Sequence, residues 1–176
     1  MNTHIKMACV SGLVCLQASS HALATSKTHE QAKRFVADYL SLINTHNINV
    51  VGLYSESATI NVTVTTLDRA TTKREIGGHT WKQLLRDAWY NGRPSIEPAE
   101  LHDVMIQENG DGRLTITAHR YAMRRCYWDN SYRMEIAETT TGGFKVVNET
   151  LFIDHQNQCQ HSDPATIRQS IEISQP

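Results

Sequence analysis

Apolar residues recur at helical spacing near the start of the chain. Between Glu30 and Ile43 they form an i, i+4, i+7, i+8 stripe with charged residues between them. Such a stripe predicts an amphipathic helix that buries one face. The turn-forming residues 44–47 end this helix, and Asn47 or Asn49 can cap a short second helix. We therefore expect the first two elements to form a helical hairpin.

The pattern then changes from helical spacing to strict alternation. In residues 58–66, isoleucine and valine alternate with asparagine and threonine, which is typical of a half-buried strand. After the glycine pair 77–78, apolar residues return to helical spacing over 81–89. Thr80 can cap this segment, which predicts a third helix.

The second half of the chain is rich in β-forming residues. Turn-forming Asn-Gly, Asp-Asn and Gly-Gly pairs divide it into four segments: 95–108, 113–128, 131–138 and 144–154. Strands joined by such turns predict an antiparallel meander. The order of elements predicts an α+β fold, a curved antiparallel sheet packed on three N-terminal helices.

Three stretches carry a known pattern of residues: FVADYLSLINTHN (35–47), LYSESATI (53–60) and GGFKV (142–146). Together with the glycine pair 77–78 they resemble the nuclear transport factor 2-like superfamily, which includes the polyketide cyclase and ketosteroid isomerase types. The resemblance covers about residues 30–154 and implies a cone-shaped α+β domain. Because this superfamily contains both enzymes and non-catalytic binding or assembly domains, the resemblance implies the fold and leaves the function open.

Comparison with the ketosteroid isomerase type concerns Tyr39 first. Tyr39 falls where that family has the tyrosine that binds the substrate oxyanion. Residues 60–62 stand near the position of the family's general-base aspartate, and Arg133 and Met134 near that of its second aspartate. Neither place holds a carboxylate, so isomerase chemistry is not expected. We interpret Tyr39 as an amphipathic residue of the cone wall.

A polar cluster on the strand 113–128 gives a candidate ligand site. His119 and Tyr121 share the odd-numbered face of this strand. If that face lines the cone, they join Tyr39 and Trp89 in a partly apolar cavity for a small apolar ligand or for acid–base chemistry. The alternative is a sheet surface that faces solvent or a partner. The sequence leaves both interpretations open.

The last predicted strand carries apolar residues on both faces. Strict alternation places Phe144, Val146 and Phe152 on one face, and Val147, Leu151 and Ile153 on the other. Such a strand implies a second covering layer. In the superfamily that the chain resembles, the outer sheet face commonly pairs two protomers. We therefore expect a homodimer.

The first residues have the features of an export signal. Lys6 precedes a mostly apolar stretch at 7–16, and Ala22-Leu23-Ala24 is an A-x-A cleavage pattern. We expect a signal peptide over 1–24, a nuclear transport factor 2-like domain over 25–157, and a polar tail over 158–176. The mature protein is then periplasmic or secreted.

Cysteines and charge narrow the expectations further. Cleavage leaves Cys126 and Cys159, which either form a disulfide or remain as two unpaired thiols. The chain has 17 basic and 18 acidic residues, so no nucleic-acid partner is expected. No later apolar run is long enough to predict a membrane span. We also expect no cofactor and no metal.

The sequence therefore predicts an exported, non-catalytic module that binds a small molecule or a partner. One alternative is an isomerase-, dehydratase- or hydrolase-type enzyme that uses polar residues of the cone cavity. Another is a subunit of an envelope assembly.

Overall fold

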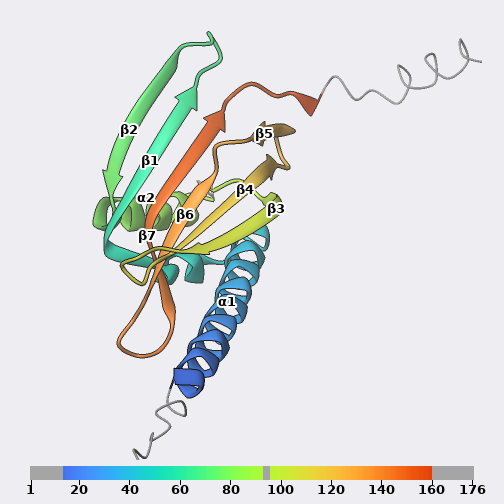
Figure 1. The fold of residues 1–176 in the computed structure, drawn as a ribbon. Helices are drawn as coiled ribbons and strands as arrows, with labels where there is room; N and C mark the ends of the chain where they lie inside the picture. The colour runs from blue at the N-terminus through green and yellow to red at the C-terminus, as the bar shows by residue number, and fades with distance from the viewer. Residues whose placement is uncertain (1–13, 93–95, 160–176) are drawn as a thin grey trace, which may run out of the picture.

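The computed structural model describes residues 14–92 and 96–159 (Figure 1). Positions 1–13 of the predicted signal and 160–176 of the predicted tail lie outside the described residues. The described elements follow in the order α1 (Val14–Asn44), η1 (Ile48–Leu53), β1 (Tyr54–Thr65), β2 (Thr71–Gly77), α2 (Gly78–Tyr90), β3 (Ala99–Glu108), β4 (Leu114–Ala122), β5 (Tyr127–Asp129), β6 (Arg133–Glu138) and β7 (Phe144–Asp154). The predicted α+β class is confirmed.

Within the described residues, the strands form one curved, unclosed sheet. Its order is β2-β1-β7-β6-β4-β3, and β5 pairs with the end of β4. The sheet is mixed rather than wholly antiparallel, because β1 runs parallel to β7 with Thr59 opposite Asn148. Helices α1 and α2 lie against one face of the sheet (Figure 1), and side chains from both layers meet in the hydrophobic core. We call the helix-facing side the inner face and the opposite side the outer face.

The helix boundaries follow local chemistry. Asn47 caps the 3-10 helix η1, and its side-chain oxygen accepts a hydrogen bond from the Asn49 N–H at 3.0 Å. Helix α2 begins at Gly78, two residues before the predicted cap Thr80. A side chain at position 78 would place its Cβ 2.3 Å from the carbonyl oxygen of Ser55, so only glycine permits this close contact between α2 and β1.

Strand β2 is an edge strand that the sequence pattern did not predict. It spans Thr71–Gly77 and pairs antiparallel with β1. Most of its residues are exposed, and it carries Lys73, Arg74 and Glu75. Exposed charges are common on edge strands, where they oppose pairing with another chain. The hydrophobic alternation that indicates a half-buried strand is therefore missing.

A bulge in β7 corrects the prediction that both faces of this strand are apolar. Val147 is an extra residue, because Ile136 of β6 pairs with Val146 and Glu135 pairs with Asn148. Residues after the bulge are shifted by one position relative to strict alternation. Leu151 is buried in the core and Ile153 packs against it, on the same side as Val146. The covering layer that was expected from this strand is therefore supplied by the protein's own helices.

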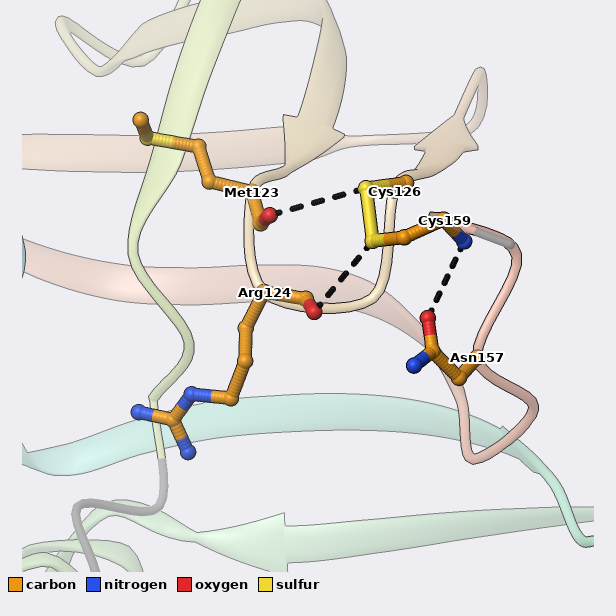
Figure 2. Close-up of a disulfide and its surroundings, with 5 residues drawn as sticks. All are labelled: Met123, Arg124, Cys126, Asn157 and Cys159. Carbon is orange, nitrogen blue, oxygen red and sulfur yellow. Dashed lines mark hydrogen bonds between the residues drawn. A yellow bond between two sulfur atoms is a disulfide. The ribbon is translucent and has the colours of Figure 1, made fainter. Parts of the chain in front are cut away.

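The predicted long strand 113–128 is interrupted by a turn, and this turn carries a disulfide. Residues 123–126 connect β4 to β5, and Cys126 has a positive φ of 57°. Cys126 is bonded to Cys159, 33 residues further along the chain (Figure 2). The Gln158 N–H also donates to the carbonyl oxygen of Arg125 at 2.8 Å. The segment after β7 is thus fastened to the turn after β4.

None of the helices in the described part of the chain is both long and apolar enough to cross a membrane.

Candidate functional site

A buried carboxylate lies in the core, between the helices and the sheet. Glu149 of β7 is fully buried, and it accepts hydrogen bonds from three tyrosine hydroxyls. Tyr39 of α1 and Tyr132 donate to Oε1 at 2.9 and 3.0 Å, and Tyr54 of β1 donates to Oε2 at 2.6 Å. Both carboxylate oxygens are therefore bound by the protein's own side chains. We call these four residues the Glu149 cluster.

The electrostatics of the Glu149 cluster reflect its burial. Loss of water raises the pKa of the Glu149 carboxyl above its usual value. The hydrogen bonds from the three tyrosines and the positive charge of Arg120 act in the opposite direction. Burial and the charge of Glu149 also raise the pKa of Tyr39, Tyr54 and Tyr132. These hydroxyls therefore stay protonated and remain donors to the carboxylate.

A second polar group in the core is only partly paired. Arg120 of β4 is 4% exposed, and its Nη2 donates to the backbone oxygen of Glu97 at 3.4 Å. Glu97 is 7% exposed, and its Oε2 lies 3.4 Å from Nη1 of Arg125. Within the described residues, Arg120 Nη1, Glu97 Oε1 and the indole nitrogen of Trp81 are buried without a hydrogen-bond partner. Each such group costs about 1–3 kcal/mol.

These three residues line one small cavity of about 30 Å³. Trp81 comes from α2, Glu97 from the segment before β3, and Arg120 from β4. Apolar walls are provided by Ile96, Leu151 and Ile153, and Arg125 and Tyr127 complete the lining. We call this cavity the Trp81–Glu97–Arg120 pocket.

The residues that the sequence suggested for the cavity are not brought together. Tyr39 is in the Glu149 cluster. His119 is exposed and its Nδ1 lies 2.9 Å from the side-chain oxygen of Asn130, while the ring of Tyr121 lies 4.9 Å from that of Trp128. Trp89 is half-buried and donates to the His46 carbonyl oxygen at 2.5 Å.

The direction of β4 explains this separation. Its even-numbered residues Ala118, Arg120 and Ala122 are buried, so the inner face is the even one. His119 and Tyr121 lie on the outer face, as in the alternative interpretation of this strand. The sequence held a signal for this, because the even positions of the strand carry the apolar residues Leu114, Ile116, Ala118 and Ala122, whereas the odd positions carry threonine, histidine and tyrosine.

The outer face carries exposed apolar side chains beside a groove. Val104, Met105 and Trp128 are 41%, 67% and 48% exposed. The groove has a volume of about 550 Å³, and Val104, Met105, His119, Asn130 and Arg133 are among its lining residues. The buried residues Ala118 and Tyr132 also line it, so the groove reaches in from the outer face to the Glu149 cluster. Trp128 joins this region through its ring contacts with His102 and Tyr121. We call Val104, Met105, Tyr121 and Trp128 the outer patch.

The disulfide and its neighbours adjoin the pocket without forming a thiol site. Figure 2 shows both sulfur atoms close to the carbonyl oxygens of the turn, 3.8 Å from that of Met123 and 3.5 Å from that of Arg124. A disulfide carries no thiol proton, so these are contacts and not hydrogen bonds. Cys126 directly follows Arg125, which lines the pocket. The bridge therefore helps to position one pocket residue.

Comparisons with known proteins give the fold but no closer relationship. No family model and no curated protein matches the sequence. A scytalone dehydratase-like protein from Novosphingobium aromaticivorans superposes with a TM-score of 0.51 at 10% identity, over 72% of this chain and 83% of that one. ActVI-ORFA from Streptomyces coelicolor gives 0.48 at 7% identity, over 70% and 95% of the two chains. The yeast UBP3-associated protein BRE5 gives 0.47 at 15% identity, over 70% and 93%.

At these identities a structural likeness shows the fold alone. The match with the scytalone dehydratase-like protein has the highest TM-score of the three and covers most of both chains. It agrees with the curved, unclosed sheet packed on helices that is described above. The chain has the cone fold of the nuclear transport factor 2-like superfamily.

Proposed function

We propose that this protein is an exported, non-catalytic binding module that pairs with a second copy of itself through the outer patch. The observation that carries this proposal is a contrast between the two sides of the sheet. The inner face is filled by core side chains and by the Glu149 cluster. The outer face has exposed apolar side chains and an open groove.

The inner face argues for a module without catalysis. Pockets that enclose a small molecule usually measure about 300–1,000 Å³. The Trp81–Glu97–Arg120 pocket measures about 30 Å³, too little for a whole substrate. A general acid or base must also reach the group whose proton it transfers. Glu149 is surrounded by tyrosines that already occupy both of its oxygens.

The outer patch has the composition of an interaction surface. Exposed apolar residues with a polar rim mark many protein–protein contacts, and aromatic residues and methionine are enriched there. The patch combines Trp128, Tyr121 and Met105 with His119 and Arg133 at its border. A second copy is the occupant we propose. An envelope-assembly subunit would use the same surface for a different protein.

Export is part of this proposal. It rests on the positive charge, the short apolar stretch and the A-x-A pattern before residue 25. The Cys126–Cys159 disulfide supports it, because disulfides persist in oxidising compartments and are rare in the cytosol.

Sedimentation of the protein purified after export tests the pairing. We expect the mass to rise from monomer to dimer with concentration. Trp128→Ser should raise the dimer dissociation constant at least about tenfold, because an aromatic anchor of an interface commonly contributes that much. Tyr90→Ser is the matched control, since Tyr90 is 86% exposed and lies at the end of α2. A monomer mass at every concentration would contradict the homodimer, and capture of another envelope protein by the patch would favour the assembly alternative.

The enzyme alternative has its own requirement. A substrate would have to reach Glu149, the buried carboxylate with the raised pKa. Displacement of the tyrosine hydroxyls by an added compound, seen as a change in the Tyr132 or Tyr54 ring resonances, would favour that alternative.

A further inference from the structure

We infer that the Trp81–Glu97–Arg120 pocket binds a neutral group that both accepts and donates hydrogen bonds, a terminal carboxamide or hydroxyl carried on an apolar body. This site is independent of the outer patch, because it lies on the inner face of the sheet. Its three polar residues come from α2, from the segment before β3 and from β4, and they line the same small cavity.

The unpaired atoms define the chemistry of the group. The Trp81 indole and the Arg120 guanidinium each offer an N–H, and Glu97 offers a carboxylate oxygen. Trp81, Glu97 and Arg120 are each more than nine-tenths buried. Buried polar groups of this kind are nearly always hydrogen-bonded in native proteins. A partner must accept from the two donors and donate to the carboxylate, as a carboxamide or a hydroxyl does.

The surrounding charges favour a neutral group. Glu97 is paired with Arg125 at 3.4 Å, and the positive charge of Arg120 stabilises the ionised form of Glu149. The four charges therefore form two compensating pairs, Glu97 with Arg125 and Glu149 with Arg120. A carboxylate entering the pocket would meet Glu97, and an ammonium group would meet Arg120. Either charged group would also lose its water, which is costly for a buried ion without a free counter-charge.

The dimensions explain why only the tip of the ligand enters. A volume of about 30 Å³ holds about two groups of the size of water. Arg125 lines this pocket and also a larger open groove of about 590 Å³. Thr66, Leu67 and His155 border that groove, and Leu67 is 78% exposed. The polar tip fits the pocket, and the apolar body lies along Ile153 toward Leu67.

A series of probes with one common body tests the inference. Hexanamide, 1-hexanol, N,N-dimethylhexanamide, hexanoate and hexylamine differ only in the terminal group. We would follow the indole N–H resonance of Trp81 during titration of the exported protein. Hexanamide and 1-hexanol should shift this resonance in a saturable way. The dimethyl amide, which cannot donate to Glu97, and the two charged probes should bind at least about tenfold more weakly.

Two variants separate the pocket from the rest of the molecule. Trp81→Phe keeps an aromatic ring but removes the indole donor, and with it the resonance followed above, so hexanamide binding to the variants and to the wild type is measured by isothermal titration calorimetry. Trp81→Phe should weaken this binding about tenfold. Trp89→Phe is the same change outside the pocket and should leave the affinity unchanged. Equal binding of hexanamide and its dimethyl derivative would overturn the inference. An indole resonance that no probe shifts would also overturn it, since the cavity would then hold solvent only.

Discussion

Glu149 and Glu97 are both buried carboxylates of the core, yet their oxygens end in different surroundings. Glu149 receives three tyrosine hydroxyls, so both of its oxygens are bound. Glu97 has one oxygen near Arg125 and the other without a partner among the described residues, beside an unpaired guanidinium nitrogen and an unpaired indole. A buried carboxylate whose two oxygens are both hydrogen-bonded by the protein stabilises the fold. A buried carboxylate with one free oxygen can still accept a hydrogen bond from a ligand. The comparison therefore assigns a structural role to Glu149 and a binding role to Glu97.

Removal of the Glu149 carboxylate should have the largest effect. Glu149→Ala leaves three buried hydroxyls without their acceptor and Arg120 without its nearby negative charge. We expect a loss of about 3–5 kcal/mol in the free energy of unfolding. Urea unfolding followed by circular dichroism measures this, and Glu75→Ala on the exposed edge strand is the control, with a change within about 0.5 kcal/mol. A loss below about 1 kcal/mol would contradict the structural role of Glu149.

The pH dependence of stability gives a second test of the same cluster. Burial raises the pKa of Glu149 in the folded protein above its value in the unfolded chain. At pH values between these two pKa values, the folded state therefore binds more protons than the unfolded state. The contribution of this group is fully present below the unfolded pKa and is lost as the pH rises through the folded pKa. The stability of the wild type relative to Glu149→Gln should therefore fall as the pH rises above about 4.5. Urea midpoints of both proteins across this range measure it, and a difference that rises with pH would contradict the sign.

Removal of a single hydrogen-bond donor should change the free energy of unfolding least. The loss should be larger in the Glu149 cluster, where the donor is paired, than in the Trp81–Glu97–Arg120 pocket, where it is unpaired within the described part of the chain. Tyr132→Phe removes a donor to Glu149 and should cost about 1–2 kcal/mol. Trp81→Phe removes an indole N–H that has no partner among the described residues, so the lost desolvation cost offsets part of the lost packing. Its change in unfolding free energy should be smaller than that of Tyr132→Phe, measured by the same urea method. A larger loss for Trp81→Phe would mean that its N–H is paired in solution.

Local patterns in the sequence predicted the elements but not the way they combine. The amphipathic stripe of α1, the Asn47 cap and the alternation in β1 depend on neighbouring residues, and the structure contains all three. The parallel pairing of β1 with β7 joins distant segments, and no local pattern encodes it. The same limit applies to β2, whose exposed charges lack a hydrophobic period.

The inward-facing residues of β7, which belong to the Glu149 cluster and to the lining of the Trp81–Glu97–Arg120 pocket, were missed for a related reason. One bulged residue, Val147, moves Leu151 and Ile153 to the inner face and changes the interpretation of the whole strand. The period of two is reliable only while the pairing is regular. Glu149 lies two residues after Val147, so its inward direction could not be derived from alternation. Tyr39 is buried in the core, and its hydrogen-bond partner Glu149 could not be named from the sequence.

The parallel pairing of β1 with β7 also has a consequence for the order in which the chain can fold. Thr59 and Asn148 lie opposite each other although nearly the whole domain separates them along the chain. Tyr54 and Glu149 are joined across the same interval. A chain that has not yet extended past residue 154 lacks the strand that joins β1 to β6, and also the acceptor for its buried tyrosines. Such long-range contacts form slowly. The core is therefore completed late, when β7 has reached β1.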